Sequence, residues 1–552
     1  MKKFGSSIRN IPMTETTLRE SKGCSPTGKT KTAKSATSGE KVHIMMKKLI
    51  AGVSAAALTA GLSAGYAAQP APGSVIEQNG EENTANVAQT SSSNASLIDQ
   101  DAVNAKADVL QDGADNSSSI IQFDEFGEFP GNPGAFDDDP FASVEQRGNS
   151  NSAVIFQDAT GETRSLDVII DQSGDGNASD VMQTGTGQGP TNGMRTDITQ
   201  GGGDSATVTQ FLGDAARDLD ATISQSGGGT ATVTQSANGA GSGFVSTDII
   251  QNGVGTVDVM QSIDAADSTD LTATVDQTDG GAARINQTLT GDSNSFLDAS
   301  ITQNGTDDAT INQRADFADG TSLNATIDQT NTGGPSNIAV MTQTDATNLA
   351  DGNLDGTITQ NGSGNDAELT QVNRGHLANI TQIGADNLVD VDQNFVNNTV
   401  TIDQLSTGIA FASANSALVI QDSEDNVATI AQENDLNRST IRQGDAGSNT
   451  GNWAMTTQTG QDNTSHIDQR FSMNGTVTLT ASGDDNLSNV NHLGLSDTAT
   501  VDQSGNDNES TITQTGSVMG AGNTATVNQM GDGYTSTLTQ IGSGNDAIIS
   551  QH

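Results

Sequence analysis

Glutamine recurs at a fixed spacing through most of the chain, and this spacing constrains the fold more than any other feature. Two stretches keep a step of eleven residues without exception: Gln78, Gln89, Gln100, Gln111 and Gln122, and later Gln360, Gln371, Gln382, Gln393 and Gln404. About 36 glutamines follow the pattern, and two further units carry Ala481 and His492 in the glutamine place. A unit this short cannot enclose a core by itself, so the units must stack on one another.

The residues around each glutamine predict a strand followed by a turn. An aliphatic residue stands two positions before the glutamine, as in Ile380 and Ile402, and a small residue stands four before. Asparagine often stands six before, so these positions share one face of a strand. The opposite parity carries Thr, Asp, Ser and Asn. Glycine and asparagine follow each glutamine and suit turns that need positive φ.

The spacing also shows how many strands form one layer of the stack. Between Gln157 and Gln329 short steps of about 10 or 11 residues alternate with long steps of about 15 to 17. Strict alternation places all long turns on one edge, as a layer of two strands requires. We therefore predict an all-β fold, a β-solenoid or cross-β stack of strand–turn–strand rungs with about 22–26 residues per rung. Some 19 rungs about 4.8 Å apart would give a length of roughly 90 Å.

Stacked glutamines and asparagines can bond their side-chain amides along the stack, which satisfies buried polar groups without water. The predicted ladder positions are Gln360, Gln371, Gln382, Gln393, Gln404, Gln421, Gln432, Gln443, Gln503, Gln514, Gln540 and Gln551, with Asn365, Asn387, Asn398, Asn426, Asn437, Asn508 and Asn545. The predicted turn glycines are Gly384, Gly505, Gly531 and Gly542.

Composition and charge exclude several classes of protein. Only 32% of residues are hydrophobic and 3% aromatic, too few for a conventional core in 552 residues. The formal net charge is −46, and because about half of the 22 basic residues precede residue 49, the remainder carries a net charge near −54. Such a surface repels nucleic acid and anionic membranes. The five histidines are scattered and no catalytic motif is present, so we expect no enzyme, no cofactor and no metal centre.

The sequence divides into five segments. Residues 1–45 form a basic polar leader whose translation depends on whether Met45 or Met46 is the start, and residues 46–68 read as a Sec signal peptide. The apolar run of the signal is too short to span a membrane comfortably, so we expect no membrane insertion after cleavage. The first repeats occupy 69–122, a Phe/Asp/Pro-rich insertion occupies 123–145, and the main array occupies 146–552. The insertion is either a partner-docking segment or a tolerated loop.

At these residues the sequence resembles the curlin repeat of bacterial curli fibre subunits, whose pattern is Ser-x5-Gln-x4-Asn-x5-Gln with glycine in the turn. Gln382-x4-Asn387-x5-Gln393 and Gln421-x4-Asn426-x5-Gln432 match its second half. The resemblance implies a functional amyloid of the cell surface of a Gram-negative bacterium, secreted through a curli-type outer-membrane pore, assembled on a nucleator, and serving biofilm matrix and adhesion. The array also lacks a recognisable cap at either end, which predicts end-to-end self-association into fibres.

Other interpretations stay open at this stage. A monomeric surface β-solenoid could act as an adhesin, or it could bind ice through outward Thr-x-Thr pairs such as Thr511/Thr513. Low hydrophobicity and high charge also fit disorder, chiefly during export. Two Gly-x-Gly-x-Asp turns, at 362–366 and 542–546, are similar to calcium turns, but the tandem nonapeptide of real calcium sites is missing.

Overall fold

A computed structural model describes residues 73–552 apart from a set of connections between strands. The connections left out are 125–139, 160–162, 165, 187–190, 214–215, 239–240, 242, 254, 265–269, 279–280, 291–295, 317–321, 347–352, 408–413, 445–449 and 517–519. The leader and the signal peptide, residues 1–45 and 46–68, therefore lie outside the described residues.

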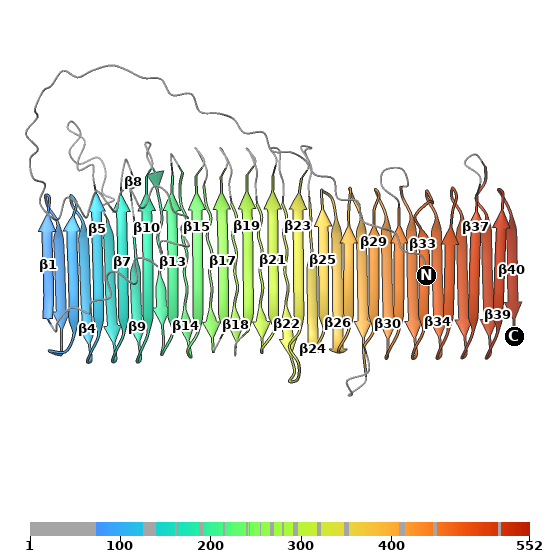
Figure 1. Cartoon of the computed structure of the whole chain (residues 1–552), viewed down its shortest axis with the longest axis horizontal. Helices are drawn as coiled ribbons and strands as arrows, with labels where there is room; N and C mark the ends of the chain where they lie inside the picture. Colours follow the sequence, from blue (N-terminus) through green and yellow to red (C-terminus); the bar gives the residue numbers. More distant parts are fainter. Residues whose placement is uncertain are drawn as a thin grey trace, which may run out of the picture. The chain divides into compact units, whose positions relative to one another are not determined.

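The described residues form two large parallel sheets, and successive strands run alternately in opposite directions as the chain passes from one sheet to the other (Figure 1). The first sheet has nineteen strands, joined in chain order. They are β1 (Gly73–Asn79), β3 (Ala95–Asp101), β5 (Ser117–Asp124), β7 (Ser152–Ala159), β10 (Ala178–Gly185), β13 (Ser205–Leu212), β15 (Thr230–Ala237), β17 (Thr256–Ile263), β19 (Ala282–Leu289), β21 (Asp308–Ala315), β23 (Ile338–Asp345), β25 (Asp366–Val372), β27 (Leu388–Gln393), β29 (Ser416–Gln421), β31 (Arg438–Gln443), β33 (Thr464–Gln469), β35 (Leu487–His492), β37 (Glu509–Thr515) and β39 (Thr535–Ile541).

The second sheet takes the intervening strands, again in chain order. They are β2 (Thr84–Gln89), β4 (Lys106–Asp112), β6 (Phe141–Arg147), β9 (Ile169–Ser173), β12 (Ile198–Gln200), β14 (Gln225–Ser226), β16 (Gln251–Asn252), β18 (Gln277–Thr278), β20 (Gln303–Asn304), β22 (Gln329–Asn331), β24 (Thr357–Ser363), β26 (Leu377–Ala385), β28 (Thr399–Leu405), β30 (Val427–Glu433), β32 (Trp453–Thr459), β34 (Thr476–Ser482), β36 (Thr498–Ser504), β38 (Thr524–Met530) and β40 (Asp546–Gln551). A separate short pair joins β8 (Thr163–Arg164) and β11 (Thr191–Asn192).

The register of the pairs brings like residues together. Along β13, β15 and β17, for example, Gln210 pairs with Gln235 and Gln235 with Gln261. The step between paired residues is 22 where Ala95 pairs with Ser117, and 26 where Thr230 pairs with Thr256. The all-β solenoid with rungs of about 22–26 residues is therefore confirmed.

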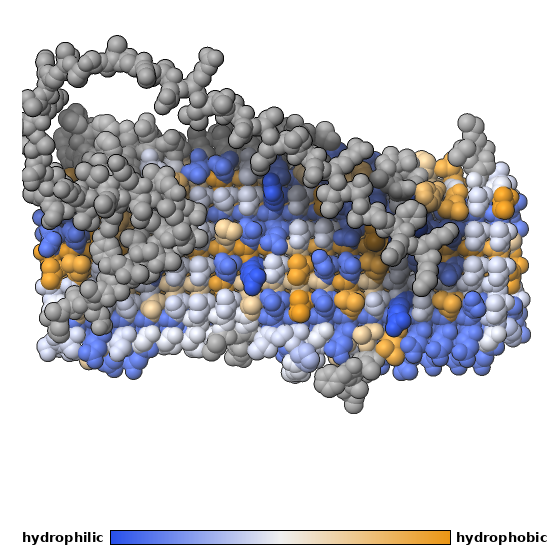
Figure 2. All heavy atoms as spheres, in the orientation of Figure 1, coloured by the Kyte–Doolittle hydropathy of each residue, from blue (hydrophilic) through white to orange (hydrophobic). Residues whose placement is uncertain are grey.

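The core lies between the two sheets. Inward positions two and four before each glutamine hold buried Ile, Val, Leu and Ala, and these make one continuous cluster that extends from Ile98 to Leu538. The core layer between the sheets is only two side chains thick, which explains how a chain with so few aliphatic and aromatic residues can be well packed. Outward positions are mostly Thr, Asp, Asn and Ser, and the exposed face in Figure 2 is largely hydrophilic.

From β7 to β23 the long connections follow strands of the first sheet, whereas the connection from β28 to β29 follows a strand of the second. From β7 to β23 each such connection is longer than the return to the first sheet; Ala237 ends β15 and Gln251 begins β16, whereas only three residues separate Asn252 from Thr256. The stack also continues across the Phe-rich insertion, because β4 pairs with β6 and β5 with β7. Phe123 and Asp124 complete β5, and residues 141–145 belong to β6.

Candidate functional site

The glutamines form two columns, one in each sheet. In the first sheet, every glutamine from Gln78 to Gln443 donates from Nε2 to Oε1 of the next glutamine along the stack, at 2.7–3.1 Å, so that the run ends at Gln469. The bond between Gln514 and Gln540 continues the column at 2.7 Å. The predicted positions in this column are Gln371, Gln393, Gln421, Gln443, Gln514 and Gln540.

The second column is built in the same way but in separate stretches. It extends from Gln89 to Gln251 at 2.6–3.3 Å and from Gln329 to Gln458 at 2.6–3.0 Å. The last stretch joins Gln503, Gln529 and Gln551. The predicted positions in this column are Gln360, Gln382, Gln404, Gln432, Gln503 and Gln551.

In many of the column glutamines the second N–H of the amide bonds across the core. Gln382 donates to the backbone oxygen of Asp366 at 3.2 Å, and Gln514 donates to that of Thr498 at 3.1 Å. One side chain thus links its own sheet along the stack and the two sheets to each other. Because both N–H groups are used, the buried amide avoids the penalty of about 1–3 kcal/mol that an unpaired polar group incurs.

Asparagines make further columns at the turns, here called the corners. Asn365, Asn387, Asn437 and Asn508 lie at the corner that precedes first-sheet strands, and Asn398, Asn426 and Asn545 lie at the other. The backbone N–H and the Nδ2 of Asn387 both donate to Oδ1 of Asn365, at 3.1 and 3.0 Å.

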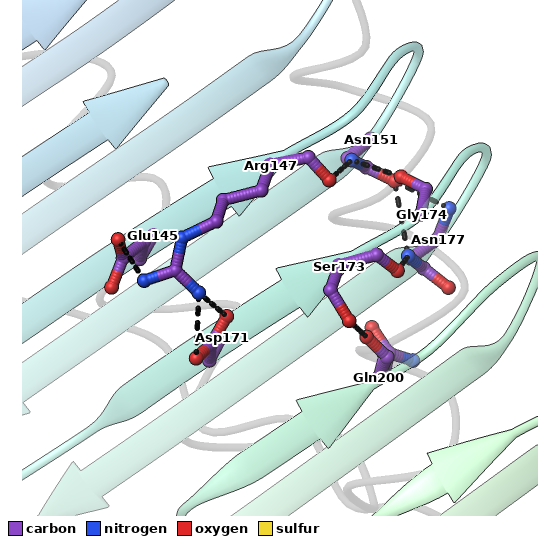
Figure 3. Close-up of polar contacts among 8 residues, drawn as sticks. All are labelled: Glu145, Arg147, Asn151, Asp171, Ser173, Gly174, Asn177 and Gln200. Atoms are coloured by element: carbon purple, nitrogen blue, oxygen red, sulfur yellow. Dashed lines mark hydrogen bonds and ion pairs between the residues drawn. The ribbon is translucent and has the colours of Figure 1, made fainter. Parts of the chain in front are cut away.

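Figure 3 shows the same arrangement between β6 and β9 and the strands that follow them. Asn177 Nδ2 donates to Asn151 Oδ1 at 3.1 Å and to the backbone oxygen of Ser173 at 2.9 Å. Asn151 Nδ2 reaches the oxygen of Gly174 in the next rung at 2.9 Å. Each corner side chain therefore fixes its own turn and the adjacent one.

The four predicted turn glycines all have positive φ, from +105° at Gly384 to +128° at Gly531. At Gly384 an added Cβ would lie 2.2 Å from the backbone oxygen of Ser406, and at Gly505 it would lie 2.2 Å from that of Gly531. The space at Gly542 is open apart from Asn545 Nδ2 at 3.7 Å. The glycine oxygens accept bonds from corner asparagines; Asn365 donates to Gly384 at 3.1 Å and Asn508 to Gly531 at 2.8 Å.

Both glutamine columns are interrupted at neighbouring strands, where β34 carries Ala481 and β35 carries His492. His492 is fully buried, and within the described structure neither ring nitrogen has a hydrogen-bond partner. Burial lowers the pKa of His492 to about 4, and the adjacent Gln514 amide opposes this shift without cancelling it. His376, by contrast, replaces a corner asparagine; its Nδ1 accepts from the backbone N–H of Asn398 at 3.4 Å.

The structure adds a feature that the sequence reasoning missed. From β9 to β22 one corner is apolar, with Leu166, Met194, Leu219, Val245, Leu271, Leu297 and Leu323 in place of asparagine. These residues pack against Leu212, Ile263 and Leu289 from the first sheet in a second buried cluster. The sequence does contain a signal for this apolar corner, because a leucine, methionine or valine stands six residues before every second glutamine in this region.

In the same region the glutamine column of the second sheet loses bonds. Gly229, Gly255 and Gly281 stand where the facing corner elsewhere has asparagine, and a Cβ on Gly255 would lie 2.6 Å from Gln277 Nε2. The Gln277 amide occupies the space that a side chain at position 255 would fill, and its Nε2 donates to the backbone oxygen of Gly281 at 3.1 Å. Gln251 Nε2 and Gln277 Oε1 then have no partner in the described structure.

Acidic residues gather on the outward face. Asp390 and Asp392 lie on β27, and the pKa of Asp392 is raised first by burial and then by Asp390, Glu368 and Asp422. Burial also raises the pKa of Asp390. Like charges stacked this closely cost stability when ionised.

The residues that suggested calcium binding or ice binding have structural explanations within the stack. Asn365 and Asn545, in the two Gly-x-Gly-x-Asp turns, are corner residues bonded within the asparagine columns. No group of three or more His, Cys, Asp or Glu residues in the described part of the chain could hold a metal ion. Thr476, Thr498 and Thr524 do stack outward, but the column continues into Trp453.

Comparison with known proteins gives one family. Residues 353–384 and 520–552 match the curlin associated repeat. Both stretches include strands that stack at a step of 22, as Thr357 does on Asn379 and Thr524 on Asp546. No curated protein matches the chain. Among the described residues there is also no helix long and apolar enough to cross a membrane.

Proposed function

With curlin associated repeats at two places in the chain and glutamine and asparagine columns through the stack, we propose that this protein is the structural subunit of a secreted curli-like amyloid fibre of the cell surface. The fibre would contribute to biofilm matrix, adhesion and cell aggregation. The observation that carries the proposal is that the first and last described rungs fit each other as successive rungs of one stack.

The end strands supply the first part of this fit. Within the described residues β1 and β2 pair on one side only, as do β39 and β40. If β1 of a second copy pairs with β39 through aligned glutamines, Gln78 follows Gln540, Ile76 follows Leu538 and Ser74 follows Ser536. On the other sheet Gln89 follows Gln551, and Val87 and Ala85 follow Ile549 and Ala547. Every inward column therefore continues with a residue of its own kind.

The direction of the amide bonds supplies the second part. Each glutamine donates toward the following rung, so Gln540 and Gln551 at one end offer N–H groups, while Gln78 and Gln89 at the other offer Oε1 acceptors. Head-to-tail addition joins donors to acceptors, whereas head-to-head addition opposes oxygen to oxygen. The fibre is thus polar.

The five sequence segments and the expected partners have roles in the same proposal. The segment 46–68 directs Sec export, residues 69–122 and 146–552 carry the repeats on either side of the insertion, and a curli-type pore and a nucleator subunit are the partners. A body with a net charge near −54 would stay soluble and extended on the way out. The alternative, a monomeric surface β-solenoid acting as an adhesin or an ice-binding protein, is favoured only by stacked outward threonines, such as those of β34, β36 and β38 and those of β37 and β39. Thermal hysteresis of the monomer would support ice binding.

The test places a lysine in the terminal rungs. Ile549→Lys puts a charge at an inward position that a second copy would bury, and Val87→Lys does so at the other end. Ile541→Lys is the matched control, because Ile541 points outward and is 76% exposed. We expect the parent and Ile541→Lys to form fibres with a reflection near 4.7 Å. Each inward variant alone should not elongate, and a mixture of the two should stop at dimers. Parent protein that stays monomeric and gives no such reflection would overturn the proposal.

A further inference from the structure

One part of the first sheet has an apolar outward surface. Ile121 and Phe123 on β5, Phe156 on β7, Met182 on β10 and Phe211 on β13 all have the outward parity, because each stands one residue before or after an inward glutamine. We call these five residues the aromatic strip. It is independent of the rung ends that carry the fibre proposal.

The strip occupies four neighbouring strands and forms one unbroken column over the first three, whereas on β13 Met182 pairs with Thr209 and Phe211 pairs with Thr184. The register stacks Ile121 on Phe156 and Phe156 on Met182. The rings of Phe123 and Phe156 meet edge to face with centroids 5.8 Å apart. The next rungs are polar on both sides, with Asp99 and Asp101 on β3 and Thr234 and Ser236 on β15. The strip therefore has defined limits.

Part of this surface is shielded from water although it faces outward. Ile121 is 5% exposed and Met182 is 8% exposed. Met260 lies in the same column, five strands from Ile121 and three from Met182, and is 48% exposed. Burial also raises the pKa of Asp180, which stands beside Met182 on β10. Two methionines in equivalent positions thus differ sixfold in exposure.

The chain itself contains a matching segment. Residues 125–139 leave β5 at Asp124, one residue beyond Phe123, and contain Phe126, Phe129 and Phe136. We propose that the aromatic strip is the docking surface for this segment of the same chain. Fifteen residues reach about 50 Å when extended, whereas the strip spans roughly 15 Å, the width of four strands. The phenylalanines can therefore lie on it without strain on the stack.

Apolar contact, and not charge, must drive this docking. The segment carries five acidic residues, and the surface around the strip carries Asp158 and Asp180. Added salt should therefore strengthen docking by screening the repulsion between like charges.

The test measures how fast an introduced thiol reacts with a maleimide in full-length protein whose native cysteine is removed by Cys24→Ser. Met182→Cys reports on the strip, and Met260→Cys is the matched control. The variant of the segment is Phe126→Ser, Phe129→Ser and Phe136→Ser together, which keeps its length and charge. We expect this triple change to speed the labelling of Met182→Cys at least fivefold and to leave that of Met260→Cys unchanged.

Equal labelling of Met182→Cys with and without the triple change would overturn the proposal. Protection that survives the triple change but disappears on dilution would overturn it in favour of a second copy on the strip. Loss of the stack in the triple variant would appear as faster labelling at Met260→Cys as well. In that event a second variant tests the proposal, and it carries Phe126→Leu, Phe129→Leu and Phe136→Leu together. This variant should keep Met182→Cys protected from the maleimide, and rapid labelling of Met182→Cys in it would also reject the docking.

Discussion

The buried amide is the residue-scale unit of this protein. A glutamine such as Gln382 receives a bond from the rung before, donates to the rung after, and donates to the opposite sheet. Each net bond contributes only about 1 kcal/mol, but a lost partner leaves a buried polar group that costs about 1–3 kcal/mol. A single substitution therefore affects three rungs, and substitutions that keep the amide are the tolerated ones.

His492 gives a prediction at this scale. Its folded pKa of about 4 lies below the ordinary value of 6.5, so between these values the unfolded chain binds a proton that the folded chain does not. Stability is thus complete above pH 6.5 and falls as the pH approaches 4, by about 3 kcal/mol in total. His492→Gln removes this loss and also supplies the missing amide between Gln469 and Gln514.

Urea unfolding at pH 7 and pH 4.5 measures the effect. We expect His492→Gln to unfold at higher urea than the parent, with the larger difference at pH 4.5. His552→Gln, at an exposed position, is the control and should behave as the parent does. Burial also lowers the pKa of His376, so part of the acid sensitivity should persist in His492→Gln. An equal acid-induced loss in His492→Gln and parent would contradict the assignment.

At the scale of the element, the rung exists in two forms. The 22-residue rung is closed at its corners chiefly by asparagines, whereas the rungs near β9 to β22 have one corner closed by leucine and its equivalents. In these wider rungs the second-sheet strands from β12 to β22 shorten to two or three residues, because preceding residues such as Ser246 and Asp298 adopt positive φ. Apolar packing there takes over from amide bonding.

This difference predicts that corner residues cannot be exchanged between the two forms. Leu271→Asn would leave the amide among Ile263, Leu289 and Leu297 with no asparagine to bond, and we expect a loss of about 3–5 kcal/mol in the free energy of unfolding. Asn426→Leu, the reverse change, should also destabilise, because it removes the acceptor that Asn452 uses.

Urea titration of both variants checks this prediction. Thr274→Asn, an outward change on the same segment as Leu271, is the control and should stay within about 0.5 kcal/mol of the parent. If Leu271→Asn is as stable as Thr274→Asn, the leucine corner does not hold the wide rungs together.

At the scale of the whole molecule, the negative charge opposes both stacking within a chain and addition of copies. Acids with a raised folded pKa, such as Asp390 and Asp392, destabilise the fold while they are ionised. As the pH falls they take up protons in the folded state before the unfolded chain does, so this cost disappears. Acidification from pH 7.5 to 5 should therefore favour the stacked state through these acids, while His492 opposes it below pH 6.5.

We expect fibre growth, followed by amyloid-dye fluorescence, to start several-fold sooner at pH 5 than at pH 7.5, and added salt to shorten the lag at pH 7.5. Asp390→Asn with Asp392→Asn should reduce the difference between the two pH values. A lag that responds neither to pH nor to salt would show that charge does not limit assembly.

The sequence by itself determined the repeat, the strands and the inward face. Strand parity is local, so the glutamine at every eleventh position, the aliphatic residue two before it and the glycine after it are enough to assign each residue to a side. Alternating long and short steps even placed the wide turns at one edge, since that needs only the order of strands along the chain.

Only the tertiary structure decided which residues meet. The leucine corner depends on Leu271 of one sheet lying against Ile263 and Leu289 of the other, and the aromatic strip depends on the register that stacks Ile121, Phe156 and Met182 across a 35-residue step and a 26-residue step. Unequal connections hide such contacts from any fixed period in the sequence. A strand's own pattern fixes the face of each side chain, but the neighbour on that face is fixed by pairing between rungs, which is a property of the stack.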